Sequence, residues 1–256
     1  MRAASRVYFM LLRLCGDRFV VHHELFRERL VTQYGFTGHS VALMPHPVYV
    51  PEEGRLVDVG VDLLGKLPRP YLVVPGYLAD YKNPEVVLDA VESGVLRENV
   101  VFAMGANPRQ RSREYGKRYN RLRQRAIALS NVVWLGFIDG DDVLMRLIEE
   151  SRGVILPYLE CVGASGIAAI AAGTGTPLFY SACLEPVCKG LGVAFGDTAV
   201  ELGACLTGMD LIDVPTVGRL GEELGAAPTR LEEIWHSTLA ALVGPGGIVP
   251  GLREAC

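Results

Sequence analysis

Residues Val154–Phe179 read VILPYLECVGASGIAAIAAGTGTPLF, and this stretch decides the fold. Its apolar start predicts a buried strand at 153–156, its alanine-rich centre predicts a helix from about Ser165, and a second strand follows Pro177. Strands that alternate with helices in this way indicate a parallel sheet. Because parallel sheets bind ligands at the carboxyl ends of their strands, the start of this helix is a candidate binding position.

Ser165 and Gly166 form that helix start. Ser165 suits the N-cap position, since its hydroxyl can accept a hydrogen bond from a backbone N–H of the first turn. Gly166 leaves the turn without a side chain, so a ligand can approach the backbone closely. Free N–H groups and the positive end of the helix dipole favour a phosphate there. The pattern taken alone also fits an ordinary capped helix.

Length and composition are those of a globular protein. The chain has 256 residues, half of them hydrophobic, and a net charge of −4, which gives no overall attraction to nucleic acid or to an anionic membrane. Its six cysteines form no C-x-x-C pair, which argues against a structural zinc site and fits a reducing compartment. No apolar run approaches the roughly 18 residues of a membrane-spanning helix. We therefore expect a cytoplasmic protein.

The rest of the chain alternates between predicted strands and helices. Strands are expected at 71–74, 100–104, 132–135 and 192–195, and helices at 84–93, 112–129, 143–150 and 198–206, with loops at 76–83 and 105–108. This block predicts a doubly wound, Rossmann-like α/β domain. The first fifty residues offer a helix at 3–14, strands at 18–22 and 40–44 and a helix at 24–34, too few for a second complete domain. A final helix is expected at 229–242.

Four stretches carry a resemblance to a known family. They are GYLADYKN at 76–83, NVVWLGF at 131–137, the segment from LPY at 156–158 to Pro177, and residues 17–22 together with 44–49. The first looks like Gly-Arg-Leu-x-x-x-Lys-Gly, the second like N-V-x-F-L-G-F, the third like L-P-Y…S-G…A…G-x-P. The fourth looks like the last strand pair of an N-terminal domain. In this order they resemble the C-terminal, donor-binding half of GT-B glycosyltransferases, most closely family 4 (group 1).

The resemblance implies a division of the chain and a function. Residues 1–50 would be the remnant of an acceptor-side domain, 51–70 a linker, 71–228 the domain that binds the nucleotide sugar, and 229–256 a crossover helix and tail. The implied activity is transfer of a sugar from a nucleoside-diphosphate sugar to an acceptor hydroxyl. Because most of the acceptor half is missing, the alternative is a non-catalytic nucleotide-sugar-binding module, or a subunit that needs a partner.

The resemblance also implies the site residues. Lys82 is expected to bind the donor phosphates as a catalytic residue, and Glu160 is a second catalytic candidate that would contact sugar hydroxyls. The expected donor-binding residues are Gly76, Tyr77, Lys82, Gly105, Ser165 and Gly166. Neither a cofactor beyond the donor substrate nor a metal is implied, and Asp139–Asp142 is interpreted as a turn and helix start.

The sequence departs from the family pattern at three positions. Tyr77 stands where many members have arginine, and Val162 and Ile170 stand where the family often has two glutamates. These departures concern the ribose contact and the stereochemical outcome of transfer.

Three surfaces raise the question of partners. Residues 109–125 hold eight basic side chains, a pattern that fits nucleic-acid binding, a solvated helix face or steering of an anionic nucleotide sugar; we expect no nucleic-acid partner. Arg2, Arg6 and Arg13 beside apolar residues fit either an ordinary packed helix or peripheral membrane contact. The apolar face expected at 229–242, with Trp235, has little to cover it. It predicts a homo-oligomer or a separate N-terminal-domain subunit.

Overall fold

A computed structural model describes Phe9, Leu12, Arg13 and residues 18–44, 60–163, 165–189 and 191–207. They fall into two compact units, and each is treated by itself. The helix expected at 229–242 and its Trp235 lie outside the described residues, as does linker segment 51–59. Of the helix expected at 3–14, only Phe9, Leu12 and Arg13 are described, and they are helical.

The described part of the small unit contains a strand–helix–strand motif. Strands β1 (Phe19–Val21) and β2 (Val41–Leu43) pair in parallel and are connected through α2 (Glu24–Tyr34) and a short 3-10 helix, η1 (Gly38–Ser40). Helix α2 begins after His23, whose Nδ1 accepts a hydrogen bond from the Leu25 N–H, and ends at Gly35 in the left-handed region (φ 71°). The strands and the helix predicted in this region are confirmed.

The large unit is built on a parallel sheet. Its strands are β3 (Tyr71–Tyr77), β4 (Asn99–Gly105), β5 (Val132–Trp134), β6 (Gly153–Leu156), β7 (Leu178–Ser181) and β8 (Gly192–Phe195). Among the described residues the strand order is β5-β4-β3-β6-β7-β8, with every pair parallel. From β3 the chain adds β4 and then β5 toward one edge of the sheet. It then returns to the centre and adds β6, β7 and β8 toward the other edge. This is the predicted doubly wound, Rossmann-like α/β fold.

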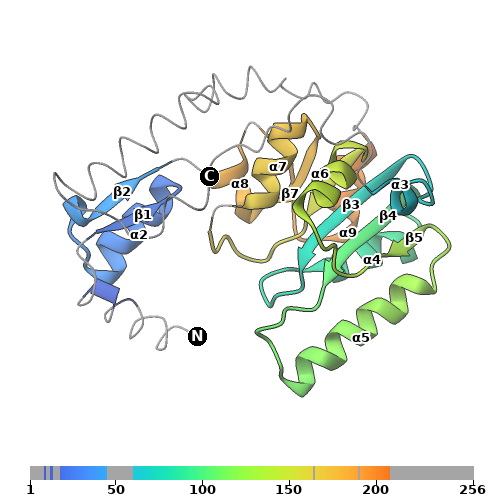
Figure 1. Cartoon of the computed structure of the whole chain (residues 1–256), viewed down its shortest axis with the longest axis horizontal. Helices are drawn as coiled ribbons and strands as arrows, with labels where there is room; N and C mark the ends of the chain where they lie inside the picture. The colour runs from blue at the N-terminus through green and yellow to red at the C-terminus, as the bar shows by residue number, and fades with distance from the viewer. Residues whose placement is uncertain are drawn as a thin grey trace. The chain divides into compact units, whose positions relative to one another are not determined.

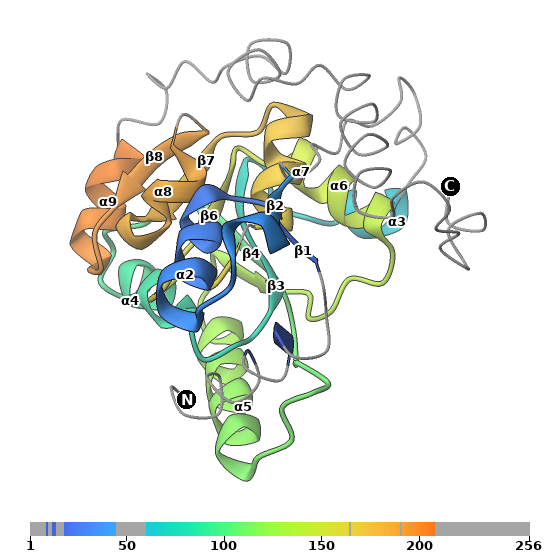
Figure 2. The same cartoon turned by 90° about the vertical axis from the view of Figure 1, so that its left-hand side faces the viewer.

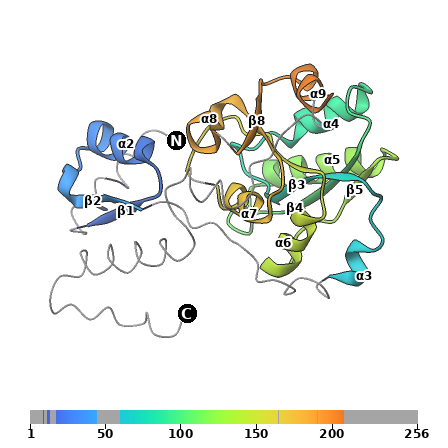
Figure 3. The same cartoon turned by 90° about the horizontal axis from the view of Figure 1, so that it is seen from above.

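Helices cover both faces of the sheet. They are α3 (Val61–Leu64), α4 (Pro84–Glu92), α5 (Arg113–Ile127), α6 (Asp141–Glu149), α7 (Gly166–Thr174), η2 (Ala182–Leu184), α8 (Glu185–Cys188) and α9 (Ala199–Thr207). Helices α4, α5 and α9 lie on one face, and α6 and α7 pack together on the other (Figures 1, 2 and 3). The sequence does not predict η2 and α8, because single turns carry no helical periodicity. No described helix has both the length and the apolar character that a membrane crossing requires.

The core lies between the sheet and its helices. Leu72, Val100, Phe102, Ile155 and Phe179 have no exposed surface, in keeping with strands that are covered on both faces. The Phe102 ring stacks on Trp134, with ring centroids 5.5 Å apart. This packing fixes the strands that carry the site at their carboxyl ends.

Two strands are longer than the sequence predicts. Strand β3 continues through Pro75 to Tyr77, and β4 continues to Gly105, so the loops expected at 76–83 and 105–108 begin later. Pairing between β3 and β4 extends from Tyr71↔Asn99 to Tyr77↔Gly105. Pairing between β3 and β6, in contrast, ends at Val73↔Val154. Pro75 is tolerated because the strand needs no donor from it on the β6 side, where the two strands have already separated.

The start of α6 also differs from the prediction. The helix begins at Asp141, and its N-cap is Gly140, which makes no side-chain capping bond. Asp141 and Asp142 lie in its first turn, so the expected concentration of acids at the positive end of the dipole is confirmed.

Two glycine substitutions should change stability with opposite signs. A Cβ at Gly153 would lie 2.5 Å from Cε2 of the buried Phe179 ring, whereas a Cβ at Gly116 in α5 would meet nothing within 4 Å. Gly153→Ala should lower the free energy of unfolding by about 1–3 kcal/mol through overpacking. Gly116→Ala should raise it by about 0.5–1 kcal/mol because alanine loses less backbone entropy in a helix. Urea unfolding at constant m-value measures both, and equal effects of the two substitutions would contradict the packing of β6 against β7.

Candidate active site at the switch point of the sheet

A cavity of about 1030 Å³ lies at the carboxyl ends of the central strands. Gly76 and Tyr77 at the end of β3, the loop that follows them, and Tyr158 just after β6 line one part of it. The starts of α6 and α7 line the rest. The winding direction of the sheet reverses between β3 and β6, and ligands of doubly wound sheets bind in the crevice at this point.

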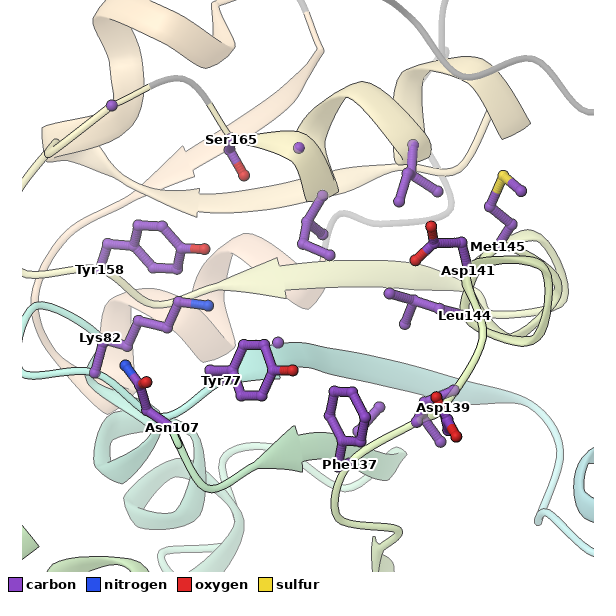
Figure 4. A pocket seen from close by; sticks show the side chains of 18 of the residues that line it. Tyr77, Lys82, Asn107, Phe137, Asp139, Asp141, Leu144, Met145, Tyr158 and Ser165 are labelled. Atoms are coloured by element: carbon purple, nitrogen blue, oxygen red, sulfur yellow. The ribbon is translucent and has the colours of Figure 1, made fainter. Parts of the chain in front are cut away.

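Lys82 points into this cavity although it is almost completely buried (Figure 4). Its residue exposure is 6%, and its Nζ lies 5.2 Å from the centre of the Tyr158 ring. In the described part of the chain no carboxylate forms an ion pair with it. Burial lowers the pKa of Lys82 to about 8, because the charged form loses hydration. A cation with no counter-ion among the described residues therefore faces the cavity.

Gly76 makes room for that cation. It has φ +111°, a conformation that residues with a side chain rarely adopt, and a Cβ placed on it would lie 2.5 Å from Nζ of Lys82. The ammonium group thus occupies the space that a side chain would take. The positive φ favours glycine at position 76, and a side chain there would also displace the Lys82 ammonium.

The Lys82 loop is tied to the loop after β6. The N–H of Asn83 donates to the Pro157 carbonyl (2.6 Å), and the N–H of Leu159 donates to the Tyr81 carbonyl (2.7 Å). Lys82 and Tyr158 form an isolated antiparallel bridge between these bonds. Burial raises the pKa of Tyr158, so its hydroxyl stays neutral. The two loops close one end of the cavity.

Helix α7 presents its N-terminus to the same cavity. Ser165 caps it by accepting a hydrogen bond from the N–H of Ala168 (3.3 Å), which confirms the N-cap prediction. Ser165 and Gly166 both line the cavity, and the first turn holds no acidic residue. Ala168, Ala169, Ala171 and Ala172 are buried, so packing fixes the helix and the direction of its free N–H groups.

The other end of the cavity is acidic and aromatic. Asp139 and Asp141 lie at the start of α6, away from Lys82 (Figure 4). The Tyr77 and Phe137 rings stack on each other, with centroids 5.1 Å apart and planes 18° apart. Both rings line the cavity and remain partly exposed, Tyr77 by 41% and Phe137 by 55%. The cavity is therefore positive at one end and negative at the other, with an aromatic surface along one side.

The structure brings most of the predicted site residues together. Those that line the cavity are Gly76, Tyr77, Lys82, Ser165 and Gly166. Gly105 does not line it; it ends β4, and a Cβ there would lie 2.8 Å from Cβ of Phe137. Its place in the site is indirect, because it lets Phe137 approach. Glu160 is exposed and does not line the cavity either, so its placement gives its predicted catalytic role no support.

Several cavity residues were not predicted as site residues. Phe137 and Tyr158 both belong to the stretches that carry the family resemblance. Phe137 lies three residues after the end of β5, and Tyr158 lies two residues after the end of β6. That position at the carboxyl edge of the sheet was the signal that could have identified them. Among the described residues no group of three or more His, Cys, Asp or Glu side chains could hold a metal ion, and this includes Asp139–Asp142.

No protein-family model matches the sequence, and a search of curated proteins found no relative. Solved structures do share the fold. A glycosyltransferase from Rickettsia africae superposes with a TM-score of 0.67 at 12% identity, covering 95% of this chain and 68% of that one. HepE from Anabaena, solved in complex with UDP and glucose, gives 0.70 at 15% identity, covering 92% and 66%.

A UDP-forming α,α-trehalose-phosphate synthase from Burkholderia xenovorans gives a TM-score of 0.66 at 15% identity, covering 88% of this chain and 61% of that one. The present chain thus spans 61% to 68% of the length of these three proteins. At such low identity the likeness concerns the fold. It confirms the predicted architecture, an α/β fold of the GT-B glycosyltransferase type.

Proposed function

We propose that the chain binds a nucleoside-diphosphate sugar in this cavity and transfers the sugar to an acceptor hydroxyl. The observation that carries the proposal is the buried Lys82 ammonium, which faces the cavity and forms no ion pair with any carboxylate in the described part of the chain. A buried charge is costly unless it is paired, so a ligand that supplies negative charge fits this position. The glycosyltransferases that share the fold support the same reading.

The proposed chemistry depends on the leaving group. The bond between the anomeric carbon and the diphosphate oxygen breaks, and the acceptor oxygen forms the new bond to that carbon. The acceptor hydroxyl gives up its proton to the departing diphosphate or to water, and negative charge collects on the diphosphate as it leaves. Lys82 and the N–H groups of α7 are already oriented toward this charge, so they stabilise it without reorganisation. In this proposal the lysine and the helix supply the positive charge, and transfer does not depend on a metal.

The opposite end of the cavity suits the nucleoside. Carboxylates such as Asp139 and Asp141 accept hydrogen bonds from ribose hydroxyls, and they would repel a phosphate. A base can lie against the stacked Tyr77 and Phe137 rings. The direction of the ligand follows from charge alone: diphosphate toward Lys82 and α7, nucleoside toward α6.

A second candidate is a module that binds the nucleotide sugar without transferring it. The position of Glu160 outside the cavity favours this alternative, because the predicted contact to sugar hydroxyls is then missing. Calorimetry with UDP- and GDP-sugars, together with a transfer assay on candidate acceptors, separates the two. Binding with sugar transfer supports the enzyme, binding alone supports the module, and absence of binding contradicts both.

Replacing Lys82 should remove most of the affinity for the diphosphate. Lys82→Ala deletes a charge-assisted contact and should weaken UDP binding by about 10- to 100-fold, corresponding to 1.5–3 kcal/mol. Removing a buried, unpaired charge should leave the thermal midpoint unchanged or raise it. Lys66→Ala, at an exposed lysine, is the matched control and should bind UDP normally. Undiminished binding by Lys82→Ala would remove Lys82 from the proposed site.

Affinity for UDP should fall as the pH rises through about 8. The pKa of Lys82 is lowered to about 8 by burial, so the ligand-free protein loses the ammonium above that pH. The association constant should then decrease by up to about tenfold per pH unit, as proton linkage requires. The phosphates of UDP are ionised well below this range, and burial raises the pKa of Tyr81 and Tyr158, so these hydroxyls stay neutral. Titration calorimetry between pH 7 and 9, below the range in which the uracil ring of UDP loses its own N–H proton, measures the slope, and Lys82→Ala should show a much smaller one.

A further inference from the structure

The loop that carries Lys82 is hydrogen-bonded to α5 as well as to the loop after β6. Between β3 and α4 the carbonyls of Leu78, Ala79 and Lys82 all accept bonds from side chains of that helix. The acceptors and donors lie 36 to 39 residues apart in the sequence. A loop that holds a buried cation at a cavity wall is thus fixed from outside the cavity.

Tyr115 and Arg118 are the two residues that make these bonds. They are three positions apart in α5 and therefore share a face of the helix. The Tyr115 hydroxyl donates to the Leu78 carbonyl (3.2 Å) and accepts from the N–H of Asn107. It thereby joins the loop after β3 to the loop after β4. Arg118 donates from Nη1 to the Ala79 carbonyl (3.2 Å) and from Nη2 to the Lys82 carbonyl (2.7 Å).

Glu85 orients Arg118 for this purpose. Nε of Arg118 donates to Oε1 of Glu85 (2.7 Å), and Nη2 donates to Oε2 (2.9 Å). The planar fork of the guanidinium can satisfy the carboxylate on one edge and the loop carbonyls on the other at the same time. A lysine has one nitrogen and cannot reproduce this arrangement.

A second arginine in α5 provides a natural comparison. Arg125 donates to Glu92 from Nε (2.9 Å) and from Nη2 (2.8 Å), and to Asp89 from Nη2 (2.6 Å). It connects the same two helices, α4 and α5, by the same kind of ion pair. Among the described residues no hydrogen bond joins Arg125 to the Lys82 loop. Arg118 thus bonds to one carboxylate and to loop carbonyls, whereas Arg125 bonds to two carboxylates of α4.

We propose that Tyr115 and Arg118 are positioning residues that hold the Lys82 ammonium at its place in the cavity, next to Gly76 and facing the N-terminus of α7. The inference rests on the proposed function for the statement that this place matters to a diphosphate. The position of the ammonium itself does not depend on that function. Arg118 and Tyr115 act through the loop backbone, and neither needs to contact the ligand.

The test compares Arg118→Lys with Arg125→Lys in the full chain. Both substitutions keep the charge and weaken the pairing of α4 with α5, at one carboxylate for Arg118 and at two for Arg125, so a purely structural role predicts that Arg125→Lys affects stability and the site at least as much as Arg118→Lys. Positioning predicts that Arg118→Lys weakens UDP binding by about tenfold, the loss of one or two hydrogen bonds, while Arg125→Lys stays within about twofold. Equal effects of the two variants on UDP binding would overturn the proposal.

A second readout needs no ligand. The chain has four lysines, so reductive ¹³C-dimethylation gives few NMR signals, and the one missing in Lys82→Ala identifies Lys82. Arg118→Lys should move the pKa of Lys82 upward toward the ordinary lysine value, because a displaced ammonium gains water. Arg125→Lys should leave it near that of the unsubstituted protein. If the unsubstituted protein binds neither UDP nor GDP, the proposed function fails, and this titration alone decides the inference.

Milder variants keep the test decisive if Arg118→Lys does not fold. Glu85→Gln weakens the orientation of Arg118 and should shift UDP affinity and the Lys82 pKa in the same directions by smaller amounts, with Glu92→Gln as its control. Tyr115→Phe removes one hydroxyl and should act likewise. If Glu85→Gln and Tyr115→Phe leave both quantities unchanged, the loop holds its place without α5 and the inference is wrong.

Discussion

The burial of one unpaired ammonium group is the constraint on which the site depends. Removing a charge from water costs several kcal/mol, and in this chain no carboxylate among the described residues offsets the cost at Lys82. The backbone of the loop that holds it is bonded on two sides, to the loop after β6 and to α5. Gly76 removes the side chain that would push it away. In the proposed function an anion offsets this cost, so the cost in the free protein becomes affinity for a phosphate.

The sheet determines where that arrangement can form. Strands β3 and β6 pair over two residues and then separate, while β3 and β4 stay paired to their ends. The gap that results is wide enough for a ligand, and two helix N-termini face it. They are not equivalent: α6 has Asp141 and Asp142 in its first turn, whereas α7 has none. Both helices offer free N–H groups, yet only α7 leaves its positive end open to an anion, so helix sequence gives the cavity its polarity.

Sequence reasoning succeeded where the determining interactions are local. The N-cap at Ser165 and the alternation of strands and helices depend on neighbours within a few residues, and both were predicted. The ends of β3 and β4 depend on register with other strands, and Pro75 gave a misleading stop signal. Phe137 enters the cavity because Gly105, in another strand, leaves space for it. Glu160 was chosen for its nearness to a motif in the sequence, but the chain direction after Tyr158 leaves it exposed outside the cavity. Such features need three-dimensional pairing that a single sequence does not contain.

The basic run at 109–125 shows how one composition can serve different purposes. Read as a sequence, its eight basic residues are equivalent and fit nucleic-acid binding. In the structure Arg118 and Arg125 lie on the side of α5 that faces α4, and each is paired with a carboxylate of that helix. Arg113, Lys117 and Arg121 recur every four residues on the exposed side, as expected for a solvated face. The number of basic residues in a segment thus says little about its partners until the residues that form ion pairs within the fold are identified. Arg118, which Glu85 holds, also donates a hydrogen bond to the Lys82 carbonyl in the loop behind the cavity. The basic run fits an external ligand when it is considered as a sequence, but in the structure this residue binds other parts of the same fold.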